Sequence, residues 1–144
     1  MSERLQLQGT AIAIEGRGVL LRGPSGAGKS SLALGLIEEG AALIADDLCE
    51  IRRSGDRLII DLPPAVDPRF RGAIERRGQG IEQVAYAGPT PLGLVVDLVK
   101  GGVATNPADT ISLLGLPILG AVLDPFRSGA VAALRKMALP GLVD

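Results

Sequence analysis

A run of eight residues near the start of the chain has the composition of a phosphate-binding loop. The run is Gly23-Pro24-Ser25-Gly26-Ala27-Gly28-Lys29-Ser30 and reads G-x-x-x-x-G-K-S. Glycines allow the backbone to turn so that several N–H groups point inward at phosphate oxygens. Lys29 supplies a positive charge for the β- and γ-phosphates, and the Ser30 hydroxyl is a ligand for the Mg²⁺ that accompanies a nucleotide. We therefore expect this run, together with Ser31, to hold the phosphates of a nucleotide.

The residues on either side of the loop have the patterns of the elements that must position it. The apolar run Gly18–Arg22 is typical of a buried strand, and Ser31–Glu39 has the pattern of a helix that ends near Gly40. The N-terminal end of this helix adds its positive dipole to the anion site. Thr10–Ile14, followed by a glycine-containing turn, predicts a hairpin that leads into the loop.

Two adjacent carboxylates, Asp46 and Asp47, follow the next predicted strand, Ala42–Ala45. Because this strand comes directly after the helix, its carboxyl end should lie beside the loop, where open sheets bind ligands. One carboxylate can help to hold Mg²⁺, and the other can accept a proton from an incoming hydroxyl. The pair alone is better explained as solvated turn residues. Beside a phosphate loop, we favour a catalytic role.

A third polar cluster is Glu75-Arg76-Arg77-Gly78-Gln79-Gly80-Ile81. Its two glycines indicate a turn at which the backbone approaches another group closely. Glu75 and Arg77 have side chains able to reach a metal ion or a phosphate, but the ion-paired end of a surface helix explains the same residues. The pattern favours a short helix over Pro68–Arg76.

The rest of the sequence predicts further elements of an α/β domain. The expected elements are strands at Leu48–Arg53, Arg57–Asp61 and Pro91–Val99, a mobile connection at Lys100–Asp109, a buried strand and turn at Thr110–Leu123, and a helix at Ser128–Leu139 capped by Ser128, with Val131, Leu134 and Met137 on one face. We expect the 144 residues to form a single domain over 1–144.

Composition excludes several classes of function. The chain has no histidine, so a Ser-His-Asp mechanism and a histidine-ligated zinc site are excluded. A formal net charge of −1 argues against broad nucleic-acid binding. We expect a cytoplasmic protein without a membrane partner, because no run has the length of a bilayer span and none resembles a signal peptide. The single cysteine, Cys49, lies in an apolar run and is expected to be buried.

Together, the three polar clusters resemble the catalytic domain of the HPr kinase/phosphorylase family. Members carry a hairpin and a G-x-S-G-x-G-K-S/T loop, then L-I/V-A-D-D, then E-x-R-G-x-G-I. The chain has Gly23–Ser30, Leu43–Asp47 and Glu75–Ile81 in the same order and spacing. A weaker resemblance continues from Thr110 to the last helix. It implies the HPr kinase/PEP carboxykinase-like α/β fold, with a P-loop-containing central sheet and flanking helices. Full-length members have a further N-terminal domain, so the chain resembles a short form.

The resemblance also implies a function. Members are serine kinases that act on HPr, the carrier protein of the sugar phosphotransferase system, use ATP or sometimes pyrophosphate with Mg²⁺, and remove the same phosphate by phosphorolysis. They are typically hexamers. By position, Asp46 would be the base in the kinase direction and the acid in the reverse, while Ser30 and Asp47 would serve Mg²⁺. Glu75 would assist the metal or water, and Arg77 would help the phosphate or brace the loop.

One departure from the family bears on catalysis. Members have a His-Gly pair on the first strand, with the histidine beside the aspartates, and the matching positions here are Gln8-Gly9. Glutamine forms hydrogen bonds but cannot gain or lose a proton at physiological pH. If the histidine handles protons, this chain should be impaired or should rely on Asp46 alone.

Two other functions stay open on the sequence. Gln8 favours a nucleotide-binding regulatory module with little catalysis. A small-molecule kinase of the nucleoside-monophosphate type also begins with a phosphate loop, but it needs arginine-rich lid segments, and residues 89–122 contain no arginine. Hydrolysis in the manner of a switch GTPase is disfavoured because the chain has no N-K-x-D motif.

Overall fold

The computed structural model of the chain describes residues 3–24, 26, 28–76, 78–102 and 109–139. Its elements, in chain order, are β1 (Arg4–Gln8), β2 (Thr10–Ile14), β3 (Arg17–Arg22), α1 (Lys29–Glu38), β4 (Ala42–Ala45), β5 (Leu48–Ser54), β6 (Arg57–Asp61), the 3-10 helix η1 (Pro68–Phe70), β7 (Ala73–Arg76), β8 (Gly80–Gln83), β9 (Thr90–Leu98), β10 (Asp109–Leu113), β11 (Leu116–Leu123) and α2 (Ala130–Ala138). No helix in these described ranges is both long and apolar enough to span a bilayer.

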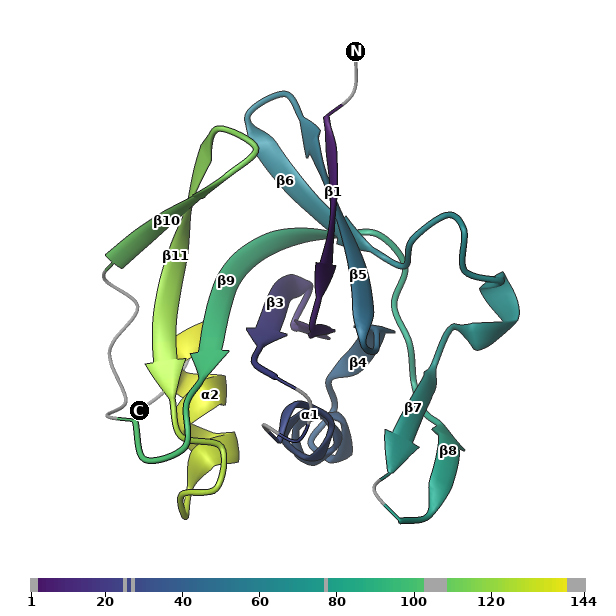
Figure 1. Cartoon of the computed structure of the whole chain (residues 1–144), viewed down its shortest axis with the longest axis vertical. Helices are drawn as coiled ribbons and strands as arrows, with labels where there is room; N and C mark the ends of the chain where they lie inside the picture. Colours follow the sequence, from purple (N-terminus) through teal and green to yellow (C-terminus); the bar gives the residue numbers. More distant parts are fainter. Residues whose placement is uncertain (1–2, 25, 27, 77, 103–108, 140–144) are drawn as a thin grey trace.

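A curled, mixed sheet forms most of the molecule (Figure 1). Its strands lie in the order β1-β5-β6-β9-β3-β2-β4, and the β10–β11 hairpin joins it through β9. Strand β9 pairs in parallel with β3 on one side and with β11 on the other, and the other neighbours are antiparallel. At its start, β9 instead pairs with β6, through Thr90 and Pro91. Strand β9 therefore links the two halves of the curled sheet.

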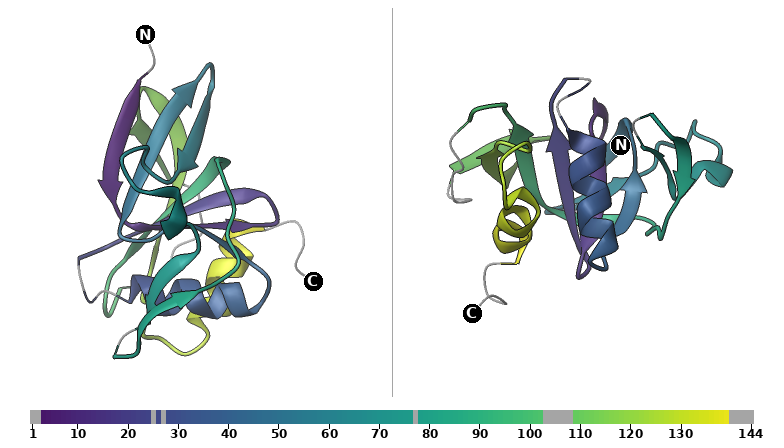
Figure 2. Two further views of the ribbon diagram at one scale, coloured as in Figure 1. Left: turned by 90° about the vertical axis from the view of Figure 1, so that its right-hand side faces the viewer. Right: turned by 90° about the horizontal axis from the view of Figure 1, so that it is seen from below.

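Alternation along the strands divides the core into two clusters. In β2, Ile12 and Ile14 belong to one cluster, and Ala11 and Ala13 to the other, because successive side chains point to opposite faces. The first cluster is covered by α1 and α2, which lie together on one side of the sheet (Figure 2). The second is enclosed by the curling of β5 and β6 over β2 and β3. The α/β class is confirmed, and α1 and α2 both pack against the same face of the sheet.

Most predicted strands are present with bounds within a residue or two, but three predictions differ. The predicted helix Pro68–Arg76 is instead η1 followed by strand β7, because the chain turns at Gly72 with a φ of +78° and β7 then pairs with β8. Ser128 does not cap the last helix, which begins after Gly129 in the left-handed conformation. The segment Thr110–Leu123 lies mostly in a half-buried hairpin. Of the predicted connection at 100–109, residues 103–108 lie outside the described ranges.

An arginine on β3 fastens α2 to the sheet. Arg17 donates from Nη1 to the carbonyl of Ala138, at the C-terminal end of α2, over 2.7 Å, and from Nη2 to the carbonyl of Gly93 over 2.9 Å. A cation at this end of a helix also interacts favourably with the helix dipole. A Cβ atom added at Gly93 would collide with the Arg17 side chain. The missing side chain at position 93 therefore makes room for the arginine.

We expect Gly93→Ala to lower the free energy of unfolding by about 1–3 kcal/mol, because it displaces Arg17 from both charge-assisted hydrogen bonds. Urea denaturation of Gly93→Ala, Arg17→Ala and the double variant measures the coupling. In the Arg17→Ala background, Gly93→Ala should have little effect. An equal loss in both backgrounds would show that the cost arises elsewhere on β9.

Candidate functional site

The predicted phosphate loop connects β3 to α1, as the sequence indicated. Gly26 and Gly28 have φ angles of +83° and +91°, which only glycine adopts freely. Ser25 and Ala27 lie outside the described residues. Within the part of the chain that the structure describes, the first turn of α1 has no acidic side chain, and no side chain caps the N-terminus of this helix. The N–H groups of the first turn are therefore able to bind an anion. Ser31 is exposed on this turn.

Lys29 folds back over the loop. Its Nζ donates to the carbonyls of Gly23, at 2.6 Å, and Pro24, at 3.0 Å. These contacts hold the ammonium group at the loop, where a phosphate would bind. The other cation next to the loop, Arg22, is held by Asp97 at the end of β9 through hydrogen bonds of 2.8 and 3.1 Å.

Asp46 is the centre of the polar contacts at the site. Its Oδ1 accepts hydrogen bonds from the Thr10 hydroxyl at 2.9 Å and the Ser30 hydroxyl at 3.3 Å, and its Oδ2 accepts one from the Glu75 N–H at 3.3 Å. These donors come from β2, α1 and β7. Strands β3 and β4 are both antiparallel to β2, so their carboxyl ends lie at the same edge of the sheet. The expected meeting of Asp46 with the loop is therefore present in the structure.

Asp47 differs from Asp46 in exposure and backbone conformation. It is exposed, and its φ is +73°, a left-handed value that is uncommon for a residue other than glycine. Its carbonyl accepts a hydrogen bond from the Gly9 N–H at 3.1 Å. Gln8, at the end of β1, is therefore joined through Gly9 to Asp47, and it is exposed opposite Leu48. Residue 8 is thus one residue away from a backbone contact with Asp47.

Cys49 is buried behind the aspartates. Its thiol donates to the carbonyl of Gly9 at 3.3 Å. Burial, with smaller contributions from the charges of Asp46 and Asp47, raises the pKa of the thiol to about 12. The group is therefore neutral at physiological pH, as expected of a structural cysteine.

Glu75 reaches the site through its backbone. It lies on β7, its side chain is exposed, and its N–H contacts Asp46. The neighbouring Arg76 donates to Glu82 at 2.6 Å, and this hydrogen bond and charge lower the pKa of the Glu82 carboxyl. Arg77 lies outside the described residues. Among its described residues, the third polar cluster, Glu75–Ile81, therefore contacts Asp46 through the main-chain N–H of Glu75 and not through a side chain.

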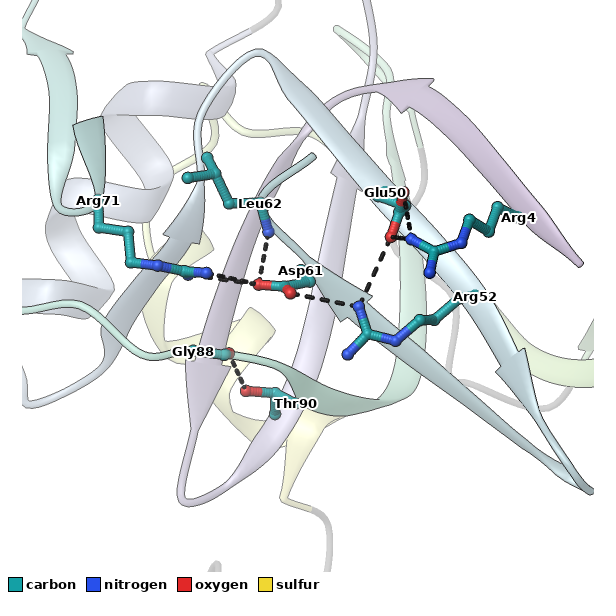
Figure 3. A network of polar contacts seen from close by, with 8 residues as sticks. All are labelled: Arg4, Glu50, Arg52, Asp61, Leu62, Arg71, Gly88 and Thr90. Carbon is teal, nitrogen blue, oxygen red and sulfur yellow. Dashed lines mark hydrogen bonds and ion pairs between the residues drawn. The ribbon is translucent and has the colours of Figure 1, made fainter. Parts of the chain in front are cut away.

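A network of ion pairs anchors the hairpin that carries Glu75. Arg71, just before β7, donates to Asp61 Oδ1 at 3.2 Å, and Arg52 donates to Asp61 Oδ2 at 3.3 Å (Figure 3). Arg52 also pairs with Glu50, which is 3% exposed and accepts a hydrogen bond from Arg4 at 3.0 Å. Each buried carboxylate is thus paired, as its desolvation requires. The network connects β1, β5 and β6 to the start of the β7–β8 hairpin.

The donor set at Asp46 fits a magnesium ion shared with phosphates. Mg²⁺ prefers oxygen ligands and is usually bound by one or two protein oxygens together with water and substrate phosphates. Ser30 and Asp46 supply two such oxygens, 3.3 Å apart. Within the described ranges, no three His, Cys, Asp or Glu side chains gather into a cage. The resemblance to the family paired Ser30 with Asp47 as metal ligands. In the structure, the Ser30 hydroxyl instead donates to the carboxylate of Asp46.

Sequence reasoning missed two contributors to this region. Thr10 is fully buried and makes the shortest hydrogen bond to Asp46. A polar residue inside the apolar run of β2 was the available signal. The second contributor is the turn after β11, which packs Pro125 against Gly28 of the loop. Nothing in the sequence near the loop indicates that contact.

Comparisons with known proteins identify the family to which the chain belongs. The family model described as the HPr Serine kinase C-terminal domain matches residues 1–87. The HPr kinase/phosphorylase of Aromatoleum aromaticum is 35% identical over 153 residues, which cover 96% of this chain and 48% of the relative. That of Burkholderia lata is 34% identical over 151 residues, covering 96% and 44%. The chain spans about half the length of these two relatives.

A solved structure supports the fold. The HPr(Ser) kinase/phosphatase from Coxiella burnetii matches with a TM-score of 0.79 and 24% sequence identity, over 92% of this chain and 93% of that chain. A match over 92% of this chain extends well beyond the phosphate loop. With the family model covering more than half of the sequence, the chain belongs to the family of the HPr serine kinase C-terminal domain.

Proposed function

We propose that the protein is a phosphotransferase that moves the γ-phosphate of ATP, with Mg²⁺, to a serine of an HPr-like phosphocarrier. We also propose that it removes that phosphate by phosphorolysis, in which inorganic phosphate takes the phosphoryl group to form pyrophosphate and the serine hydroxyl is released. The observation that carries the proposal is the contact between Asp46 and the hydroxyl of Ser30, which joins a carboxylate to the phosphate loop. Family membership supplies the class of acceptor. Pyrophosphate as an alternative donor and a homo-hexameric assembly are further parts of the proposal.

In this proposal, the loop holds and orients the donor. The main chain of residues 23–30, the start of α1 and Ser31 bind the phosphates, and the Lys29 ammonium moves from the Gly23 and Pro24 carbonyls to phosphate oxygens. Positioning and electrostatic stabilisation account for most of the rate increase in phosphoryl transfer. Mg²⁺, when bound, neutralises charge on the phosphates.

The two aspartates divide the remaining roles. The contact with Ser30 supports Asp46 as the carboxylate that shares Mg²⁺ with that hydroxyl. Asp47 is the exposed member of the pair, which supports it as the group that accepts the proton of the incoming serine. This division reverses the one expected from the sequence. Glu75 and Arg77 remain proposed aids to the metal and the phosphate.

The proposal is tested by incubating the protein with labelled ATP, Mg²⁺ and HPr. We expect label on a serine of HPr, and release of that label when phosphate is added in excess. Transfer to a nucleotide panel but never to HPr would instead identify a small-molecule kinase. Binding of ATP with transfer at background would identify the regulatory module that Gln8 favours.

A second arm of this experiment uses Gln8→His. We expect the transfer rate to rise about a hundredfold, at the lower end of what proton transfer contributes, because the residue is joined through Gly9 to Asp47. Position 8 is exposed, so the substitution should leave stability unchanged. Gln8→Asn is the matched control, because asparagine, like glutamine, can neither gain nor lose a proton at physiological pH. An unchanged rate in Gln8→His would mean that this position does not limit transfer.

A further inference from the structure

We propose that the ring of Phe126 is a stacking platform for the base of the nucleotide whose phosphates lie in the 23–30 loop. This inference rests on the proposed function and adds a base subsite to it. The ligand class is a nucleoside triphosphate, recognised through the flat face of its base. Three observations carry the proposal: the place of the ring, the rigidity of its turn and its exposure.

The sheet brings Phe126 to the loop. Strands β3, β9 and β11 run parallel to one another, so their carboxyl ends lie at one edge (Figure 1). Strand β3 enters the phosphate loop there, and β11 enters the turn that precedes α2. A Cβ atom built on Gly28 would lie 3.1 Å from Cβ of Pro125 and 3.5 Å from Cζ of Phe126. The far end of the ring therefore lies against the last glycine of the loop.

The turn that carries the ring is held by the Asp124 side chain. Its Oδ1 accepts a hydrogen bond from the Phe126 N–H, and its Oδ2 accepts one from the Gly101 N–H, each at 3.0 Å. Pro125, between these residues, has a fixed φ. The second hydrogen bond also ties the turn to the segment after β9. The backbone that carries the ring is thus positioned before a ligand arrives, which lowers the entropy cost of binding.

The ring of Phe126 is open to solvent beside the loop. Phe126 is 56% exposed although it lies beside a site with a glycine-rich loop and an open helix N-terminus. An exposed aromatic face next to a phosphate site suits a base, because aromatic stacking on a base contributes about 1–3 kcal/mol and is tolerant of base identity. The platform should therefore accept adenine and guanine alike.

The test compares a ligand that has a base with one that lacks it. We expect Phe126→Ala to weaken the binding of ATP with Mg²⁺ about tenfold, as loss of one stacking contact does, and to leave the binding of inorganic tripolyphosphate with Mg²⁺ unchanged. Titration calorimetry measures both. Phe70→Ala is the matched control, since Phe70 is 54% exposed and lies on η1. It should change neither affinity.

A second variant reads out the contact directly. The chain has no tryptophan, so Phe126→Trp introduces a single tryptophan at the ring, whose emission can be excited separately from that of Tyr86. ATP should quench its emission, whereas tripolyphosphate should not. An equal loss of affinity for ATP and for tripolyphosphate in Phe126→Ala would show that the ring only supports the loop. Unchanged affinity for both ligands would show that no base contacts the ring. Each result overturns the platform alone, whereas failure of the wild type to bind either ligand would overturn the proposed function with it.

Discussion

Asp46→Asn is expected to lower the rate of phosphate transfer to HPr by about a hundredfold to a thousandfold, roughly the effect of removing one preorganised electrostatic contributor from a developing charge. The carboxylate accepts hydrogen bonds from Thr10, Ser30 and the Glu75 N–H. An amide has a single oxygen, so its NH₂ group would have to face one of these donors. The change therefore removes the negative charge and also places an amide NH₂ group against at least one of the three donors.

The rate is measured with labelled ATP at a series of Mg²⁺ concentrations. If Asp46 shares the metal with Ser30, Asp46→Asn should also raise the Mg²⁺ concentration needed for half-maximal activity. Asp47→Asn should lower the rate without that rise. Asp56→Asn, at an exposed hairpin tip, is the control for loss of one charge. A rate in Asp46→Asn within about threefold of the control, far short of the loss expected for a carboxylate that holds the metal, would remove Asp46 from the chemistry.

The parts of this site that could be predicted from sequence are those set by local pattern. The strand, loop and helix around Gly23–Ser30 are contiguous, so glycine spacing and apolar periodicity are sufficient to predict them. The approach of Asp46 to the loop follows from chain order, since β4 comes directly after α1. These features require no knowledge of how distant strands pair.

The parts that could not be predicted depend on long-range pairing. Residues 73–76 have a helix-compatible pattern, but the turn at Gly72 and the partner β8 make them a strand, which presents a backbone N–H of Glu75 to Asp46. The approach of Phe126 to Gly28 depends on the parallel order of β3, β9 and β11. Neither pairing has a signal in the residues that it joins.

The loop lysine illustrates why a local motif still needs its surroundings. Lys29 already lies at the loop, bonded to two carbonyls that a phosphate would compete with for the ammonium group. A phosphate group carries a full negative charge and the carbonyls do not. Transfer of the Lys29 ammonium group from the carbonyls to the phosphate is therefore electrostatically favourable. Arg22 is next to the loop but is paired with Asp97, so we do not expect it to replace a lost lysine.

We therefore expect Lys29→Met to weaken the binding of ATP and of pyrophosphate by about tenfold to a hundredfold each, because each loses a charge-assisted hydrogen bond to its phosphates. The transfer rate should fall by a further hundredfold to thousandfold, roughly the effect of removing one preorganised donor from a developing charge. Calorimetry gives the affinities, and single-turnover transfer gives the rate. Lys136→Met, on the exposed side of α2, is the matched control. A loss of affinity for ATP alone would place the lysine at the nucleoside and not at the phosphates, because pyrophosphate can contact the lysine only through its phosphate groups.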